Sequence, residues 1–326
     1  MSGVSYNLGN SKPLINREQN YVLDRRLLTV HSVDRDITKY PNSNYFEIIL
    51  PETMYNVQSL RLVQCNFPGQ YYVFSDNYQN TQFLMNGDTQ FPLKIQSGIY
   101  TPQQMAAEIT TDLSFNKVVA DCSYNPISQK FSFQSVADFS LNFDIQVPYT
   151  TTCNNYNTNP VMWNQYANWG LPYNLGFDKQ NYNPIQNKNL FSVIAPHTAN
   201  ITGDTCFYME VDKYNSYDEL YPYNKSSCQM FDNNAYNGKV NSAFAKIPIN
   251  SSNYINQDSR SLFLQNVVQY DPPIERIVRL IFKFRFHDGR LVDFQNNNFD
   301  FSIEFNCLKN EIPKKYNVRI PALYNL

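Results

Sequence analysis

The sequence predicts an all-β protein built as an antiparallel β-sandwich, and three of its features lead to this class. Apolar segments of strand length recur along most of the chain. Several of them alternate apolar with polar residues, as in 139–147 and 301–305, which is the period of a strand with one buried face. Only one segment has a convincing helical pattern, and strands do not alternate with helices, which argues against an α/β arrangement.

Composition limits the possible partners. The 326 residues are 42% hydrophobic and include 23 Phe and 25 Tyr, enough for one elaborate β domain or two smaller ones. Charged residues make up 17% and the net charge is −2, so we expect no specific nucleic acid partner and no membrane contact. A chain so rich in aromatic residues and so poor in charge is typical of surfaces that are buried in an assembly. An ordinary Tyr-rich β domain is the alternative.

The first part of the chain reads as an arm followed by strands. Residues 1–25 are polar and without period, so we expect an extended N-terminal arm. A strand ending at Val30 leads to a polar corner, where we expect Asp34 to cap the turn and Arg35 to pair locally. Two further strand patterns follow at 45–50 and 57–63, with Pro51 expected to end the first of them.

One helix is predicted after residue 100. Thr101 is a good N-cap, Pro102 suits the first helical position, and Gln104 completes a capping box. The apolar stripe that should pack against the sandwich consists of Met105, Ile109 and Leu113.

The remaining strands are predicted from alternation and turns. An Asn125-Pro126 turn joins segments 118–124 and 131–133 into a hairpin. The run Ile274–Phe286 should bury one face and expose a basic one, so we expect Lys283 and Arg285 to be solvated or to pair between subunits. Further strands are expected at 190–194, 205–211, 243–249, 262–269 and 301–305.

Two long excursions interrupt the strand pattern, at about 148–190 and 213–240, and a tail covers 308–326. Long loops in compact domains are often functional. The first excursion holds both tryptophans, and its aromatic residues could anchor a protein interface, stack on sugars, or fold back onto the core. We take four of these as interface candidates: Trp163, Tyr166, Trp169 and Tyr173.

No motif for catalysis or cofactor binding is found. The chain lacks GxxxxGK, GxGxxG, HExxH and GxSxG patterns, and its only histidines are His31, His197 and His287. None of the six cysteines forms a CxxC pair, so we expect free buried thiols and no zinc site. The sequence therefore predicts no catalytic residue, no cofactor and no metal, and a protein that is not an enzyme.

One ordered set of short motifs resembles a known family. Residues 32–35 read Ser-x-Asp-Arg, residues 40–46 read Tyr-Pro-Asn-x-Asn-x-Phe, and Leu-Pro and Val-x-Ser-Leu-x-Leu follow by residue 62. This order resembles the minor capsid and related virion proteins of large icosahedral DNA viruses of the mimivirus-like and phycodnavirus-like groups. Segments 98–102, 175–177 and 285–294 extend the resemblance over 27–307, with a gap at 148–174.

The resemblance implies a jelly-roll β-sandwich over 26–307, with two tandem jelly rolls as the alternative. It implies a structural minor capsid protein that bridges or cements neighbouring subunits, with the major capsid protein, other minor capsid proteins and copies of itself as candidate partners. Such a protein would reside in the virion, and because no signal peptide pattern is found we expect synthesis in the host cytoplasm. The alternative function is a lectin-like, glycan-binding sandwich that uses the 148–190 excursion.

Overall fold

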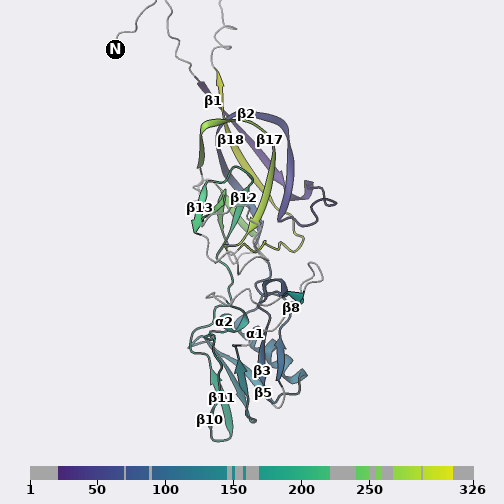
Figure 1. The fold of residues 1–326 in the computed structure, drawn as a ribbon, viewed down its shortest axis with the longest axis vertical. Helices are drawn as coiled ribbons and strands as arrows, with labels where there is room; N and C mark the ends of the chain where they lie inside the picture. The colour runs from purple at the N-terminus through teal and green to yellow at the C-terminus, as the bar shows by residue number, and fades with distance from the viewer. Residues whose placement is uncertain are drawn as a thin grey trace, which may run out of the picture.

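The computed structural model describes residues 21–69, 71–87, 90–144, 149–150, 157–158, 169–220, 240–249, 254–258, 267–287 and 289–310. The predicted all-β class is confirmed, because every strand pairing among these residues is antiparallel and the sheets are curled, as expected for a jelly-roll type of sandwich. The described strands enclose two separate hydrophobic cores, which lie one above the other in Figure 1.

The first core lies inside one curled sheet of seven strands. The sheet runs in the order β1-β18-β2-β17-β12-β15, and β16 pairs with the far end of β2. A cluster of stacked and edge-on phenylalanine rings fills its interior, and Phe67 alone contacts five of them at centroid distances of 4.8–6.2 Å. The strands are β1 (Tyr21–His31), β2 (Tyr45–Pro68), β12 (Cys206–Val211), β15 (Ala245–Pro248), β16 (Tyr254–Asp258), β17 (Val267–Arg285) and β18 (Asp300–Asn310).

The two longest strands of this sheet are β2 and β17, and both contain proline residues within the strand. The prediction that Pro51 ends a strand is wrong, because β2 continues through it to Pro68. Proline cannot donate to a ladder, and the β2–β17 register shifts between Ile277 and Arg279, opposite Pro51. A second shift spans Pro272 and Pro273 of β17. The bulges therefore accommodate the prolines without ending either strand.

The second core is formed by residues 74–201. It lies between a three-stranded sheet, order β4-β3-β7, and a four-stranded sheet, order β10-β11-β6-β5. The predicted hairpin is confirmed as β5 paired with β6. The elements are β3 (Gln82–Asn86), β4 (Gln90–Lys94), α1 (Pro102–Phe115), β5 (Ala120–Asn125), β6 (Lys130–Ser135), β7 (Ser140–Asn142), α2 (Leu171–Asn174), β10 (Ile185–Asn187) and β11 (Leu190–Ile194), with a small β8 (Tyr149–Thr150) and β9 (Asn157–Thr158) pair.

The predicted helix is confirmed with its capping box, and its three stripe residues are fully buried. Helix α1 also closes the edges of both sheets of the second core. The Thr110 hydroxyl accepts a hydrogen bond from the Cys122 N–H of β5 (3.0 Å) and donates to the Cys122 carbonyl (3.2 Å). On β4, the Asp112 carboxylate accepts from the Lys94 N–H at 3.1 Å. The helix therefore takes the place of a neighbouring strand at these edges.

The second core is an insertion into the first and not a second roll in tandem, since β2 precedes it and β12 follows it. Strand β1 begins at Tyr21 and pairs with Asn310 at the end of β18, so residues 21–25 and 308–310 belong to the first sheet. The arm before Tyr21 and the tail after Asn310 lie outside the described residues. Within the excursion predicted at 213–240, β13 (Tyr217–Leu220) pairs with β14 (Val240–Ala243).

The polar corner after β1 is held by Arg35 and Asp36. The Arg35 guanidinium donates to the carbonyls of Ser32, Tyr40 and Pro41 at 2.7–3.2 Å. The carboxylate that accepts a turn N–H is Asp36, from Thr38 at 3.0 Å, and not Asp34 as predicted. The local role predicted for Arg35 is confirmed.

Of the described cysteines, Cys65, Cys122 and Cys307 are buried and Cys206 is half-buried, and no disulfide joins any two of these four. Within the described part of the chain, no helix is both long and apolar enough to cross a membrane.

Candidate functional site

Two of the four predicted interface residues meet in one pocket of the second core. Trp169 is half-buried beside Phe143, with ring centroids 5.9 Å apart, and Tyr173 is half-buried on α2. Both line a pocket of about 540 Å³ together with Gly176, Asp178, His197 and Asn200. Trp163 and Tyr166 lie outside the described residues.

The rim of this pocket carries a histidine–carboxylate pair. His197 Nε2 lies 3.0 Å from Asp178 Oδ1, and the two side chains are 63% and 55% exposed. The Asp178 backbone N–H donates to the Tyr182 hydroxyl at 3.1 Å, and the Tyr182 ring packs on Phe177. The pair is thus exposed to solvent but attached to the buried aromatic core.

Gly176 brings the two sides of the pocket together. Its φ is +91°, and a Cβ at this position would lie 2.4 Å from the His197 carbonyl oxygen. The His197 N–H donates to the Gly176 carbonyl at 3.0 Å. Only glycine has both the conformation and the space for this approach, which gives the Leu175-Gly176-Phe177 motif a structural role.

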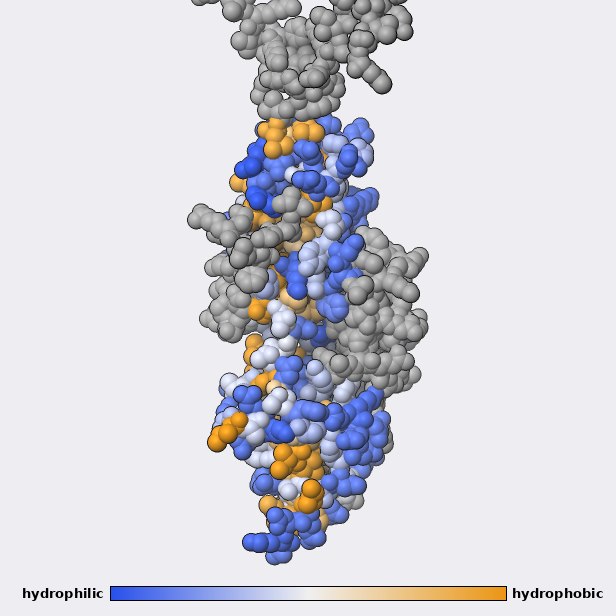
Figure 2. All heavy atoms as spheres, turned by 90° about the vertical axis from the view of Figure 1, so that its left-hand side faces the viewer, coloured by the Kyte–Doolittle hydropathy of each residue, from blue (hydrophilic) through white to orange (hydrophobic). Residues whose placement is uncertain are grey.

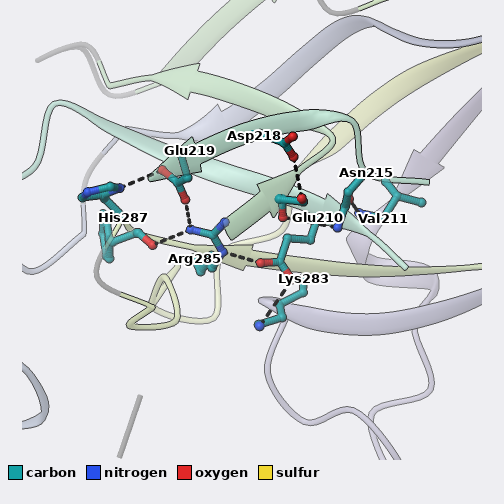
Figure 3. Close-up of polar contacts among 10 residues, drawn as sticks. Glu210, Val211, Asn215, Asp218, Glu219, Lys283, Arg285 and His287 are labelled. Carbon is teal, nitrogen blue, oxygen red and sulfur yellow. Dashed lines mark hydrogen bonds and ion pairs between the residues drawn. The ribbon is translucent and has the colours of Figure 1, made fainter. Parts of the chain in front are cut away.

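A second polar cluster lies on the outer face of β17 (Figure 3). The prediction of a solvated basic face is wrong, because the Arg285 side chain is only 1% exposed. Its guanidinium forms ion pairs with Glu210 of β12 and Glu219 of β13, and it lies over the Tyr208 ring, 5.2 Å from the centroid. Lys283 pairs with Glu210 at 3.3 Å, and both side chains are 11% exposed. The sequence held no local signal for these pairs, since the carboxylates are 66 and 75 residues away.

Glu219 joins β13 to this cluster from the other side. His287 Nδ1 lies 2.7 Å from Glu219 Oε2. Burial alone would raise the pKa of Glu219, but hydrogen bonds and charge from His287 and Arg285 outweigh it and hold that pKa below its ordinary value. The cluster therefore attaches the β13 strand to β17 through a carboxylate that stays ionised.

The outer face of the four-stranded sheet is poor in charge and exposes aliphatic side chains. Strand register places eleven residues on this face, of which three are aliphatic and two charged, and two further aliphatic residues, Val119 and Val136, flank it before β5 and after β6. The aliphatic residues are 38–75% exposed. Figure 2, which looks onto the side where β10 and β11 lie, shows apolar patches over this half of the molecule. The eleven are Asp121, Ser123, Asn125, Lys130, Ser132, Gln134, Ile185, Asn187, Leu190, Ser192 and Ile194.

Among the described residues, no group of three His, Cys, Asp or Glu side chains is arranged to hold a metal ion. The three histidines lie apart in the fold: His31 ends β1, His197 lies on the pocket rim and His287 follows β17.

No protein-family model matches the chain, and no curated protein matches it in sequence. Among solved structures it is similar to the mavirus penton protein, with a TM-score of 0.43 and 10% identity over 87% of this chain and 99% of that one. It is also similar to a chain in the structure of the Sputnik virophage, with a TM-score of 0.42 and 11% identity over 87% of this chain and 98% of that one. Likeness at this level leaves the function of the chain open.

Proposed function

We propose that this chain is a structural, non-enzymatic protein of a virus capsid, and that it bridges neighbouring subunits of the shell. The observation that carries the proposal is the charge-poor outer face of the β10-β11-β6-β5 sheet, with its exposed aliphatic side chains. A sheet face exposed to water is normally polar, with charged residues at about a quarter to a third of its positions. Here three aliphatic side chains lie on it, the exposed Val119 and Val136 flank it, and its only charged residues are Asp121 and Lys130.

The arrangement of these side chains fits a protein partner. Val119 directly precedes β5, Val136 directly follows β6 and Leu190 begins β11, and they are 68%, 63% and 38% exposed. Exposed aliphatic residues on a face with little charge resemble the centre of a protein interface, which is depleted in charge. Their burial contributes about 25 cal/mol for each Å² removed from water, from which the entropic costs of association are subtracted.

The capsid assignment rests on the order of sequence motifs over 27–307. The alternating β pattern and the antiparallel sheets around the two cores are compatible with it. The partners in this proposal are the major capsid protein, other minor capsid proteins, and copies of the chain itself. It would act in the virion, after synthesis in the cytoplasm of the host.

The test is incorporation into particles. We expect peptides of the wild-type chain in gradient-purified particles after a high-salt wash, measured by quantitative mass spectrometry. Val136→Lys and Ile194→Lys should fold normally, because both side chains are 63% exposed, but should be depleted from the particles by about tenfold or more. Ile127→Lys is the matched control, since Ile127 is 94% exposed in the turn between β5 and β6 and is not one of the strand residues of this face. Equal incorporation of all three variants would contradict the bridging role.

A further inference from the structure

We propose that the pocket between α2 and the segment after β11 binds a neutral saccharide. The inference goes beyond the capsid role and does not depend on it. The pocket has a volume of about 540 Å³, which falls within the range of about 300–1,000 Å³ typical of small-ligand sites. A pocket of this volume holds one or two sugar rings.

The lining combines aromatic side chains with polar groups at the rim. Trp169 and Tyr173 are half-buried, so each keeps part of its ring accessible from the pocket. A pyranose ring has one apolar face of C–H groups that packs on an aromatic ring, and hydroxyls around its edge that need donors and acceptors. Asp178 and His197 supply these at the rim, and Asn200 adds an amide that can both donate and accept.

The charges of the pocket favour a neutral ligand. The acidic and basic side chains Asp178 and Lys179, which line it, carry opposite charge. Recognition of phosphate or sulfate normally uses several cations or an arginine fork, and residues 71–204 contain no arginine, five Lys and nine Asp or Glu, a net charge of −4. An anionic sugar would therefore meet an unfavourable field over this half of the protein.

The polar groups are held in place before any ligand arrives. The Gly176–His197 backbone hydrogen bond fixes the distance between the two walls. Asn174 bonds across them as well, donating to the Asn200 carbonyl at 2.9 Å and accepting the Asn200 N–H at its own carbonyl at 2.8 Å. Since less order is lost on binding, a preformed site gains affinity for a small ligand.

Fluorescence of a single tryptophan tests the proposal directly. The chain has two tryptophans, so the full-length Trp163→Phe variant leaves Trp169 as the only reporter. It is titrated with the methyl glycosides of glucose, galactose, mannose and N-acetylglucosamine, and with sialyllactose as the anionic probe. We expect at least one neutral glycoside to shift the Trp169 emission with a millimolar Kd.

Variants in the same background locate the binding. Asp178→Asn and Tyr173→Ala should each weaken it by about tenfold or more, whereas Asp121→Asn and Tyr55→Ala should bind as before, since these exposed residues lie outside the pocket. Thermal melts check that each variant is folded. Because asparagine has nearly the same shape as aspartate, Asp178→Asn still tests the proposal if Tyr173→Ala does not fold.

Three results would overturn the proposal. The first is no emission shift with any neutral glycoside, and the second is binding by Asp178→Asn and Tyr173→Ala that is as tight as in the Trp163→Phe parent. The third is a response to sialyllactose alone. None of these outcomes bears on incorporation into particles, so the two proposals fail separately.

Discussion

Arg285 of β17 and Glu219 of β13 lie 66 residues apart in the chain, yet they form an ion pair in which the side chains are 1% and 7% exposed. The pair joins β13 to the outer face of the first sheet, and His287 contacts the second oxygen of the same carboxylate. A buried pair of this kind adds little net stability compared with apolar residues, but its loss leaves an uncompensated buried charge.

Removal of the Arg285 side chain should therefore be costly. We expect Arg285→Ala to lower the free energy of unfolding by about 3–5 kcal/mol, because Glu210 and Glu219 lose their shared partner. Arg279→Ala is the control on the same strand: its side chain is 63% exposed and pairs with Glu47, so it should cost about 1 kcal/mol or less. Urea unfolding followed by circular dichroism measures both, and equal losses would show that the buried pair has no special role.

Acid should weaken the attachment of β13. Because the pKa of Glu219 is lower in the folded protein than in the unfolded chain, its stabilising effect is complete above the unfolded value of about 4.3. That effect is lost as the pH falls through the folded pKa. The difference in Tm between wild type and Glu219→Gln should thus be largest near neutral pH and shrink below about pH 4. A difference that stays constant with pH would argue against an ionised Glu219.

Gly176 should tolerate no side chain. Gly176→Ala places a Cβ 2.4 Å from the His197 carbonyl oxygen at a φ of +91°, so we expect a loss of at least about 2 kcal/mol in unfolding free energy. Gly87→Ala provides the comparison, since a Cβ there meets nothing within 4 Å, and it should change stability by about 0.5 kcal/mol or less. Thermal melts of the two variants that coincide would refute the close approach.

The edge cap by α1 can be tested without changing side-chain shape. Thr110→Val removes the hydroxyl that satisfies both backbone groups of Cys122, and we expect a cost of about 1–3 kcal/mol with faster hydrogen exchange at the Cys122 amide. Thr111→Val, one position along, removes only a hydrogen bond to Ala107 within the helix and should be close to neutral. Unchanged exchange at Cys122 in Thr110→Val would mean that α1 does not cap the strand.

Features encoded by neighbouring residues were predictable from the sequence. The capping box of α1, the β5–β6 hairpin and the buried face of β17 each follow from spacing within about ten residues, and each is confirmed. Pro51 shows the limit of such rules. Proline breaks a ladder locally, but a bulge formed with a strand more than 200 residues away in the chain keeps β2 continuous.

The candidate sites were only partly predictable for the same reason. Trp169 and Tyr173 were identified by residue type, but their neighbours Asp178 and His197 come together through the backbone contact at Gly176, which no spacing rule indicates. Similarly, the basic face of β17 was recognised, and its two carboxylate partners were not, because they come from strands distant in sequence. Long-range pairing decides whether a charge is solvated or buried.

The most direct test of the capsid account is a cryo-EM map of the intact particle that carries this chain. The account predicts density for both cores within the shell, with the outer face of the β10-β11-β6-β5 sheet covered by a neighbouring subunit at Leu190 and Ile194 and at the flanking Val119 and Val136. Absence of the chain from the particle would contradict the account, and so would a map in which that face is open to solvent.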